Sequence, residues 1–195
     1  MKMDTKQDIW HPPPQGFLKF NIDGASKGNP GTAGFGGVLR DENGSILVIF
    51  HCHLGRATNN MVDLMAMEQC LDFMKQDNRQ NVIVDVDSRL IISSVKRISC
   101  GTAPEKVSKH WRLIQVFQRI QGHLLGLRTV SFNHVRRSAN KLEGILANHG
   151  VNCTECRVTM KWQELPQSKL KTICFEQAEE DREVFRNRAE EAGSK

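Results

Sequence analysis

The sequence predicts an α/β fold in which a five-stranded mixed sheet is flanked by helices. Two observations predict it. Three strand-like segments follow one another in the first third of the chain, and two later strand-like segments alternate with helical ones. Strands joined by short turns pair antiparallel, whereas strands separated by helices add to a sheet in parallel. An apolar fraction of 39% and a charged fraction of 25% are those of a globular protein.

The first three strands are expected to form the antiparallel part of the sheet. Residues 17–23 alternate apolar and polar side chains, which is typical of a strand with one apolar face, and Asp23 ends its polar face. Residues 34–40 and 46–53 are two further apolar runs, joined through an Asn-Gly pair. An Asn-Gly pair between apolar runs is the strongest short hairpin signal, so these two strands are expected to be neighbours.

Helices and strands alternate in the remainder of the domain. Thr58, Ser88 and Ser138 are suited to helix N-caps, because their hydroxyl groups accept hydrogen bonds from backbone N–H groups of the first turn. A short run rich in Val and Ile between two helices is typical of a buried strand. The expected elements are a helix over 58–75, a strand over 81–87, helices over 88–98 and 108–123, a strand over 127–133 and a helix over 138–150.

Composition divides the chain into three parts. Residues 1–15 form a polar leader that ends in a proline-rich stretch, residues 16–150 form the α/β domain, and residues 151–195 form a charged C-terminal extension. Thinly spaced apolar residues predict that this extension contains a helix over 167–192, which is either docked through them or partly mobile. They are Leu170, Ile173, Phe175, Val184 and Phe185.

Charge and hydropathy narrow the class of protein. The net charge is +5, and residues 151–195 carry 8 Lys/Arg against 9 Asp/Glu, so the positive surplus lies in residues 1–150. A modestly basic body suits a polyanionic partner. No apolar run approaches the roughly 18 residues of a membrane span, and the N-terminal segment resembles neither a secretory signal nor a transit peptide. We expect a cytoplasmic or nuclear protein without membrane contact. Nothing in the sequence specifies an oligomeric state.

Six scattered cysteines are expected to be free thiols in a reducing compartment. The alternative is a zinc site, because Cys153 and Cys156 have the spacing of a ligand pair and His149 lies four residues upstream of Cys153. Such a site needs a fourth ligand, and Cys174 is the nearest remaining thiol along the sequence.

Four motifs carry a resemblance to a known family. Residues 23–31 read DGASKGNPG, and Thr58 begins the segment Thr-Asn-Asn; residues 85–88 read DVDS, and His134 is followed by Asn140 and by Leu146-Ala147. In this order, over residues 14–150, they resemble a type 1 ribonuclease H domain, of the plant, retroelement-derived branch associated with reverse transcriptases. The resemblance implies an RNase H-like fold and a nuclease that cuts the RNA strand of an RNA–DNA hybrid.

The resemblance also assigns residues to roles. Asp23, Asp63 and Asp87 match the carboxylates that hold two catalytic Mg²⁺ (or Mn²⁺) ions, and His134 matches a histidine that transfers protons. The nucleic acid is expected to contact polar and basic residues around that site. These are Asn29, Asn59, Asn60, Arg136 and Arg137.

Two departures from the family pattern concern the metal ligands. Asp63 stands where the family offers a glutamate, and its side chain is shorter by about 1.5 Å of bond length. Gly144 stands where the family has a fourth carboxylate, and the adjacent Glu143 is turned by about 100° around the helix. We therefore expect a weakened nuclease.

Two other functions stay open. One is a module that binds nucleic acid without cutting it, and the departures at Asp63 and Gly144 favour it. The other is an interaction domain whose C-terminal helix docks a partner.

Overall fold

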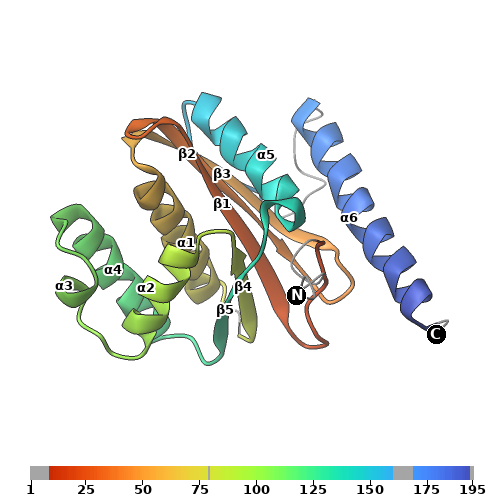
Figure 1. Ribbon diagram of the computed structural model, residues 1–195, viewed down its shortest axis with the longest axis horizontal. Coiled ribbons are helices and arrows are strands. Elements are labelled where there is room, and N and C mark those ends of the chain that lie inside the picture. Colours follow the sequence, from red (N-terminus) through yellow and green to blue (C-terminus); the bar gives the residue numbers. More distant parts are fainter. Residues whose placement is uncertain (1–8, 79, 160–168, 194–195) are drawn as a thin grey trace, which may run out of the picture.

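The computed structural model describes residues 9–78, 80–159 and 169–193. Its single sheet has the strand order β5-β4-β1-β2-β3-β6, and helices cover both faces (Figure 1). Strands β1, β2, β3 and β6 pair antiparallel, while β4 and β5 add in parallel beside β1. The strands are β1 (Leu18–Gly28), β2 (Gly31–Arg40), β3 (Ile46–Ala57), β4 (Val82–Val86), β5 (Val130–His134) and β6 (Arg157–Thr159). The predicted five-stranded mixed sheet is confirmed, and β6 is an additional short edge strand.

The helices lie in two layers. On one face, α1, α2 and α4 enclose the larger hydrophobic core with the sheet; on the other, α5 and α6 pack over Val38 and Ile49 (Figure 1). The helices are α1 (Asn59–Gln76), α2 (Arg89–Ser99), α3 (Pro104–Val107), α4 (Trp111–Leu124), α5 (Lys141–Asn152) and α6 (Lys169–Gly193), with a 3₁₀ turn, η2 (Arg137–Ala139), before α5. In the part of the chain that the structure describes, no helix combines the length and apolarity that crossing a bilayer requires.

Both faces of β1 are buried. Phe20 and Ile22 are fully buried in the larger core, whereas Asn21, on the opposite face, is fully buried beneath α5. The alternation predicted from the sequence is correct, but its polar face is covered by protein instead of water. Side chains on that face, including Asp23, therefore lie between β1 and α5.

Two of the three predicted helix caps are confirmed. The hydroxyl groups of Thr58 and Ser88 accept hydrogen bonds from the first turns of α1 and α2. Ser138 is not a cap, because it lies in η2 and Asn140 precedes α5 instead. The Asn140 side chain does not cap the helix either; its amide donates a 2.9 Å hydrogen bond to the Ile22 carbonyl oxygen and so fixes the start of α5 against β1.

The predicted C-terminal helix exists, and only part of the predicted apolar set docks it. Cys174 and Ala178 are buried against α5 and the sheet, whereas Phe175 and Val184 remain 48% and 36% exposed. Asp181 continues the stripe of Cys174 and Ala178 at helical spacing and pairs with the buried Arg40 at 3.3 Å. The helix is therefore held by one ion pair, by small buried residues and by two of the predicted apolar residues, Leu170 against the smaller core and Phe185 against the His11 ring.

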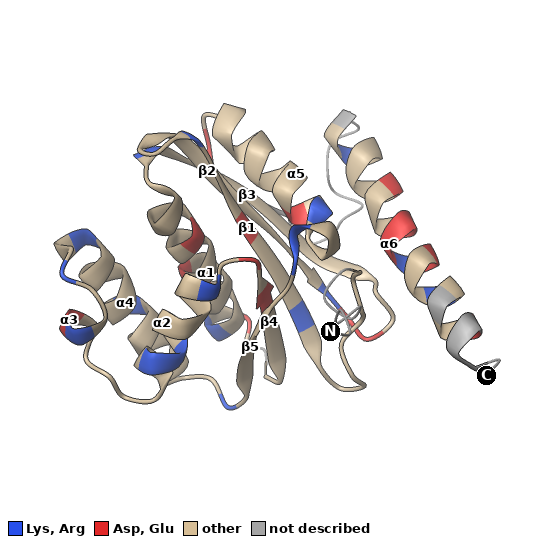
Figure 2. Ribbon diagram, viewed as in Figure 1, with Lys and Arg blue, Asp and Glu red and all other residues tan. Residues whose placement is uncertain are grey.

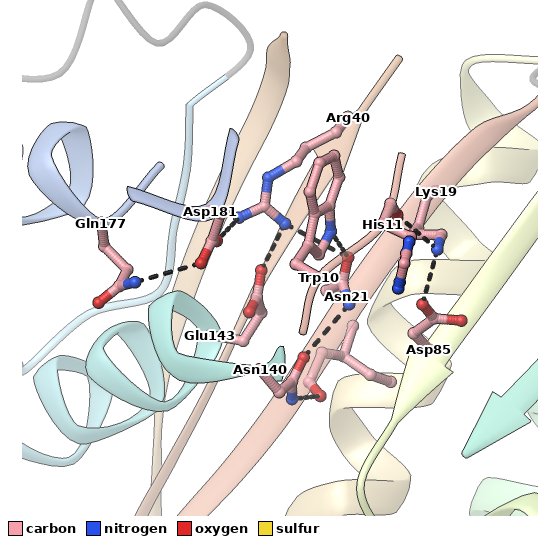
Figure 3. Close-up of polar contacts among 11 residues, drawn as sticks. Trp10, His11, Lys19, Asn21, Arg40, Asp85, Asn140, Glu143, Gln177 and Asp181 are labelled. Atoms are coloured by element: carbon pink, nitrogen blue, oxygen red, sulfur yellow. Dashed lines mark hydrogen bonds and ion pairs between the residues drawn. The ribbon is translucent and has the colours of Figure 1, made fainter. Parts of the chain in front are cut away.

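Residues of the predicted polar leader are part of this packing. Trp10 is 4% exposed, and its indole Nε1 donates a 3.0 Å hydrogen bond to Asn21 Oδ1 (Figure 3). The guanidinium of Arg40 lies 4.9 Å from the centre of the Trp10 ring, and the His11 ring contacts Phe185 of α6. The N-terminal segment and α6 thus meet over the same end of β1 and β2.

Candidate active site

Three aspartates from separate elements line one pocket of about 400 Å³. Asp23 lies on β1, Asp63 on the first turns of α1 and Asp87 directly after β4. Because β1 and β4 are parallel neighbours, side chains near their carboxyl ends meet at one edge of the sheet. Acidic segments of β1, of α1 and of the end of β4 come together there (Figure 2). The structure therefore brings together the three carboxylates that the sequence singled out.

Gly24 allows this convergence. A Cβ atom at Gly24 would lie 2.5 Å from Asp63 Oδ1 and 3.0 Å from the Asp63 backbone nitrogen. Any larger residue would push α1 away from β1. The glycine of the Asp-Gly pair is thus required by the close approach of the helix, and not by a turn, because the pair lies within β1.

The carboxylates of this pocket carry negative charge that the protein does not compensate. Burial, followed by the charges of Asp87 and Asp63, raises the pKa of Asp23 from 3.8 to about 8. Burial and the charge of Asp87 raise the pKa of Asp63 to about 7. Arg137 Nε donates a 2.9 Å hydrogen bond to Asp87 Oδ2, but the Arg137 side chain is 90% exposed, so water screens this pair.

Gly144 faces this pocket from α5. A Cβ atom there would lie 3.2 Å from Asp23 Oδ2, so a carboxylate at this position would extend toward the three aspartates. Glu143 points elsewhere, as its rotation around the helix predicts: it is 1% exposed and pairs with Arg40 at 2.9 Å (Figure 3). On the α5 side of the pocket, therefore, Gly144 supplies no carboxylate.

The pocket suits a divalent cation on two grounds. Its donors are three carboxylates, the hard oxygen ligands that Mg²⁺ and Mn²⁺ prefer. Burial and, after it, repulsion by neighbouring carboxylates raise the pKa values of Asp23 and Asp63, and a bound cation would favour their ionised forms.

The predicted nucleic-acid contacts are distributed around the pocket. Asn59 lines it, and Asn29 Oδ1 accepts a 3.2 Å hydrogen bond from the Asn59 backbone N–H, so the β1–β2 turn is held against α1. Asn60 and Arg136 are exposed but do not line it, whereas Arg137 does.

Asn148 also lines the pocket, and the sequence analysis missed it. It lies one turn after Gly144 on α5, and its side chain donates a 2.8 Å hydrogen bond to the Gly144 carbonyl oxygen. The helical repeat from Gly144 was the signal that could have identified it.

His134 lies outside this pocket. It ends β5 and lines a neighbouring pocket of about 530 Å³ together with Trp10, Lys19 and Asp85, the last two joined by a 3.0 Å ion pair. Its buried Nδ1 has no hydrogen-bond partner among the described residues. The structure does not bring His134 to the carboxylates, and its proton-transfer role stays a prediction.

Four of the six cysteines are free thiols as expected, and two depart from that expectation. Cys52 and Cys156 form a disulfide. The pairing of β6 with β3 places Cys156 beside Cys52, and no pattern in the sequence predicts β6. Cys174 lies on α6 and is buried in the smaller core, away from the predicted zinc ligands. Cys153 instead lies beside His51, 3.7 Å from its Nδ1.

Comparison with known proteins decides the family. Residues 21–150 match the family described as reverse transcriptase-like. The chain belongs to this family. The resemblance to type 1 ribonucleases H is confirmed with it.

Relatives of this reverse transcriptase-like domain are named as ribonucleases H. It is 34% identical over 140 residues to the Arabidopsis thaliana protein "Putative ribonuclease H protein At1g65750", covering 72% of the chain but only 21% of that protein. The crystal structure of RNase H1 from Halobacterium salinarum is similar over 70% of the chain and 98% of its own length, with 28% identity and a TM-score of 0.60. LC11-RNase H1 in complex with an RNA/DNA hybrid is similar over 69% of the chain and 96% of its own length, with 27% identity and a TM-score of 0.59.

Proposed function

We propose that this domain is a metal-dependent endonuclease that hydrolyses the RNA strand of RNA–DNA hybrids, with a turnover weakened by its incomplete carboxylate set. The observation that carries the proposal is the convergence of Asp23, Asp63 and Asp87 in one pocket with uncompensated charge. The similarity to a ribonuclease H solved with an RNA/DNA hybrid supports the substrate class.

Asp23, Asp63 and Asp87 would hold Mg²⁺ or Mn²⁺. Bound there, such ions activate a water molecule and offset the charge of the leaving oxygen in a phosphodiester displacement. Asp23 interacts with the charges of both Asp63 and Asp87 and lies beside Gly144, which suits a shared ligand. Gly144 leaves one ligand position without protein, so we expect weaker metal binding than in relatives with a carboxylate there.

Residues around the pocket would position the hybrid. Asn59 and Asn29 present amide groups on the exposed rim, where they can hydrogen-bond the edge of a nucleic-acid groove. Arg137 and Lys141 line the opposite rim and can bind phosphates, while Arg136 is exposed next to them. Arg137 would exchange its exposed pairing with Asp87 for a phosphate.

Binding without cleavage is the second candidate. The same rim would hold nucleic acid while Gly144 and the shorter Asp63 fail to support the metals. The two functions share every residue of the rim and differ only at the metal ligands, so a cleavage assay separates them.

The test is the cleavage of a labelled RNA–DNA hybrid by the purified chain in Mg²⁺ and in Mn²⁺. We expect slow cleavage of the RNA strand, and none after EDTA. Gly144→Asp combined with Asp63→Glu should raise the rate at least about tenfold, which corresponds to about 1.4 kcal/mol of barrier.

Gly122→Asp is the matched control, because Gly122 lies on α4 with no heavy atom near the position of its missing Cβ. This variant should leave the cleavage rate unchanged. If neither metal supports cleavage while a gel shift still shows hybrid binding, the nuclease is refuted and the binding module is correct. If the double variant cleaves no faster, the assignment of positions 63 and 144 is wrong.

A further inference from the structure

A second group of ligand atoms lies apart from the carboxylate pocket. His51 is on β3, His149 is on the last turn of α5, and Cys153 follows that helix directly. One nitrogen of each imidazole and the Cys153 Sγ all lie within 4.8 Å of one another. The two imidazole rings meet edge to face with centroids 4.7 Å apart. Three elements thus converge on one point with side chains that metals bind.

The spacing of these atoms matches that of tetrahedral ligands. Bond lengths of about 2.3 Å for Zn–S and about 2.0–2.1 Å for Zn–N set neighbouring sulfur and nitrogen ligands about 3.6 Å apart around a tetrahedral ion. The Cys153 Sγ lies 3.7 Å from His51 Nδ1. A zinc ion could therefore join these two atoms without a change in their separation.

We infer that His51, His149 and Cys153 bind one Zn²⁺ ion, with water in the fourth position. Two imidazoles and a thiolate are borderline and soft donors, which favour Zn²⁺ and disfavour Mg²⁺. The site is distinct from the proposed nuclease centre, because His149 lies five residues after Gly144, about 7.5 Å along α5 and about 140° around it.

The surroundings agree with an accessible site. His51 is 6% exposed, while His149 and Cys153 are half-buried, so the imidazole of β3 forms the floor and the other two side chains form the rim. Cys156 is not counted as a ligand. It is bonded to Cys52, which follows His51 on β3. The Cys52 side chain lies in the larger core, on the face of the sheet opposite to the His51 side chain. The nearby Arg157 carries a positive charge that opposes the binding of a cation, and the negative charge of the Cys153 thiolate would offset it.

The ion would fasten the segment after α5 to the sheet. His51 belongs to β3, whose edge pairs with β6, and Cys153 begins the stretch that leads into β6. Since metal binding favours the folded state, Zn²⁺ should raise the melting temperature, and it should release the proton of the Cys153 thiol.

The test uses the full chain, reduced with a phosphine and stripped of metal, and titrates it with Co²⁺ followed by Zn²⁺. We expect one equivalent of Co²⁺ to produce a thiolate-to-cobalt charge-transfer band and the intense visible bands of tetrahedral Co²⁺. Zn²⁺ should abolish these bands and raise the melting temperature by several degrees. Cobalt on carboxylates has no thiolate band, so the result does not depend on whether the nuclease proposal is correct.

Cys153→Ser should abolish the charge-transfer band, and His149→Gln should weaken Co²⁺ binding at least tenfold. Cys100→Ser, at an exposed free thiol, is the matched control and should change neither. Far-UV circular dichroism checks the fold of each variant, and alkylation of Cys153 in the unmodified sequence gives a second way to remove the thiolate. The inference is overturned if reduced protein shows no charge-transfer band, if the band persists in Cys153→Ser, or if Cys156→Ser removes it.

Discussion

Two groups of charged side chains lie beside α5, and they differ in whether the protein supplies the opposite charge. The first is the carboxylate pocket, composed of Asp23, Asp63 and Asp87. The second is the arginine network, composed of Arg40, Glu143 and Asp181 with Asn21 and Trp10 around them (Figure 3). Adjacent residues of α5, Gly144 and Glu143, face one group each.

The comparison distinguishes a structural charge group from a candidate metal centre. Arg40 is 1% exposed and bonds both carboxylates of its network, so the charges are paired where water cannot reach them. In the carboxylate pocket the only ion pair is made by Arg137, from the solvent side, among the residues described. Negative charge that folding leaves buried and unpaired indicates where a cation belongs.

The largest expected effect comes from removing the cation of the arginine network. Arg40→Ala leaves Glu143 and Asp181 buried without a partner, and we expect it to lower the free energy of unfolding by about 3–5 kcal/mol. Urea unfolding measures this. Arg128→Ala, at an exposed arginine, is the control and should change stability by less than about 0.5 kcal/mol. A loss below about 1 kcal/mol for Arg40→Ala would show that the network is not the structural group described.

Removing a charge from the carboxylate pocket should raise the free energy of unfolding, whereas Arg40→Ala should lower it. Asp23→Asn should lower hybrid cleavage by about 100-fold or more, because a metal ligand is lost. In metal-free buffer it should stabilise the protein. The folded-state pKa of Asp23 is raised from 3.8 to about 8, so the wild-type protein loses stability as the pH rises through this window, and the variant does not.

The measurement is urea unfolding of both proteins at several pH values in EDTA. Near pH 4 the two should be equally stable, and the advantage of Asp23→Asn should grow up to about pH 8 and then level off. Glu42→Gln, at an exposed turn, controls for the loss of a surface charge. An Asp23→Asn variant that is less stable than the wild type at pH 8 would contradict the idea of uncompensated charge.

The smallest effect is expected at the rim. Arg137→Ala breaks a pair with an exposed partner, so stability should change by less than about 1 kcal/mol. If Arg137 binds a phosphate, the slope of log K against log salt for hybrid binding should fall by about one. Fluorescence anisotropy across a salt series measures this, with Arg128→Ala as control. An unchanged slope would place Arg137 outside the interface.

The sequence was sufficient for the sheet, which depends on local patterns, while the resemblance to type 1 ribonucleases H singled out the carboxylates that the structure brings together. Asp23 ends an alternating run, and Asp87 stands between a Val/Ile-rich strand and the capping Ser88, so each position follows from its own neighbours. The resemblance likewise singled out Gly144, where the family has a carboxylate, and the structure places it beside Asp23.

The arginine network and the cysteine contacts could not be predicted in the same way. Arg40 pairs with Glu143 and Asp181, which lie 103 and 141 positions further along the chain, and no local sequence pattern predicts such pairs. Ser138 failed as a cap because Asn140 is held by β1, and the disulfide of Cys156 depends on β6, a strand of three residues. His134 ends β5, one residue beyond the predicted strand, and it lines a different pocket from the carboxylates.

The ion pair between Arg40 and Asp181 shows that the region matched by the family and the region needed for a stable fold have different limits. The family match ends at residue 150, but the partner of Arg40 lies on α6, beyond that limit. A fragment that ends at residue 150 would keep every residue of the carboxylate pocket. It would lose Asp181 and leave one side of the Arg40 guanidinium without its ion-pair partner. A protein expressed for study should therefore include α6, because the family match ends at residue 150 whereas the buried Arg40 is paired with residue 181.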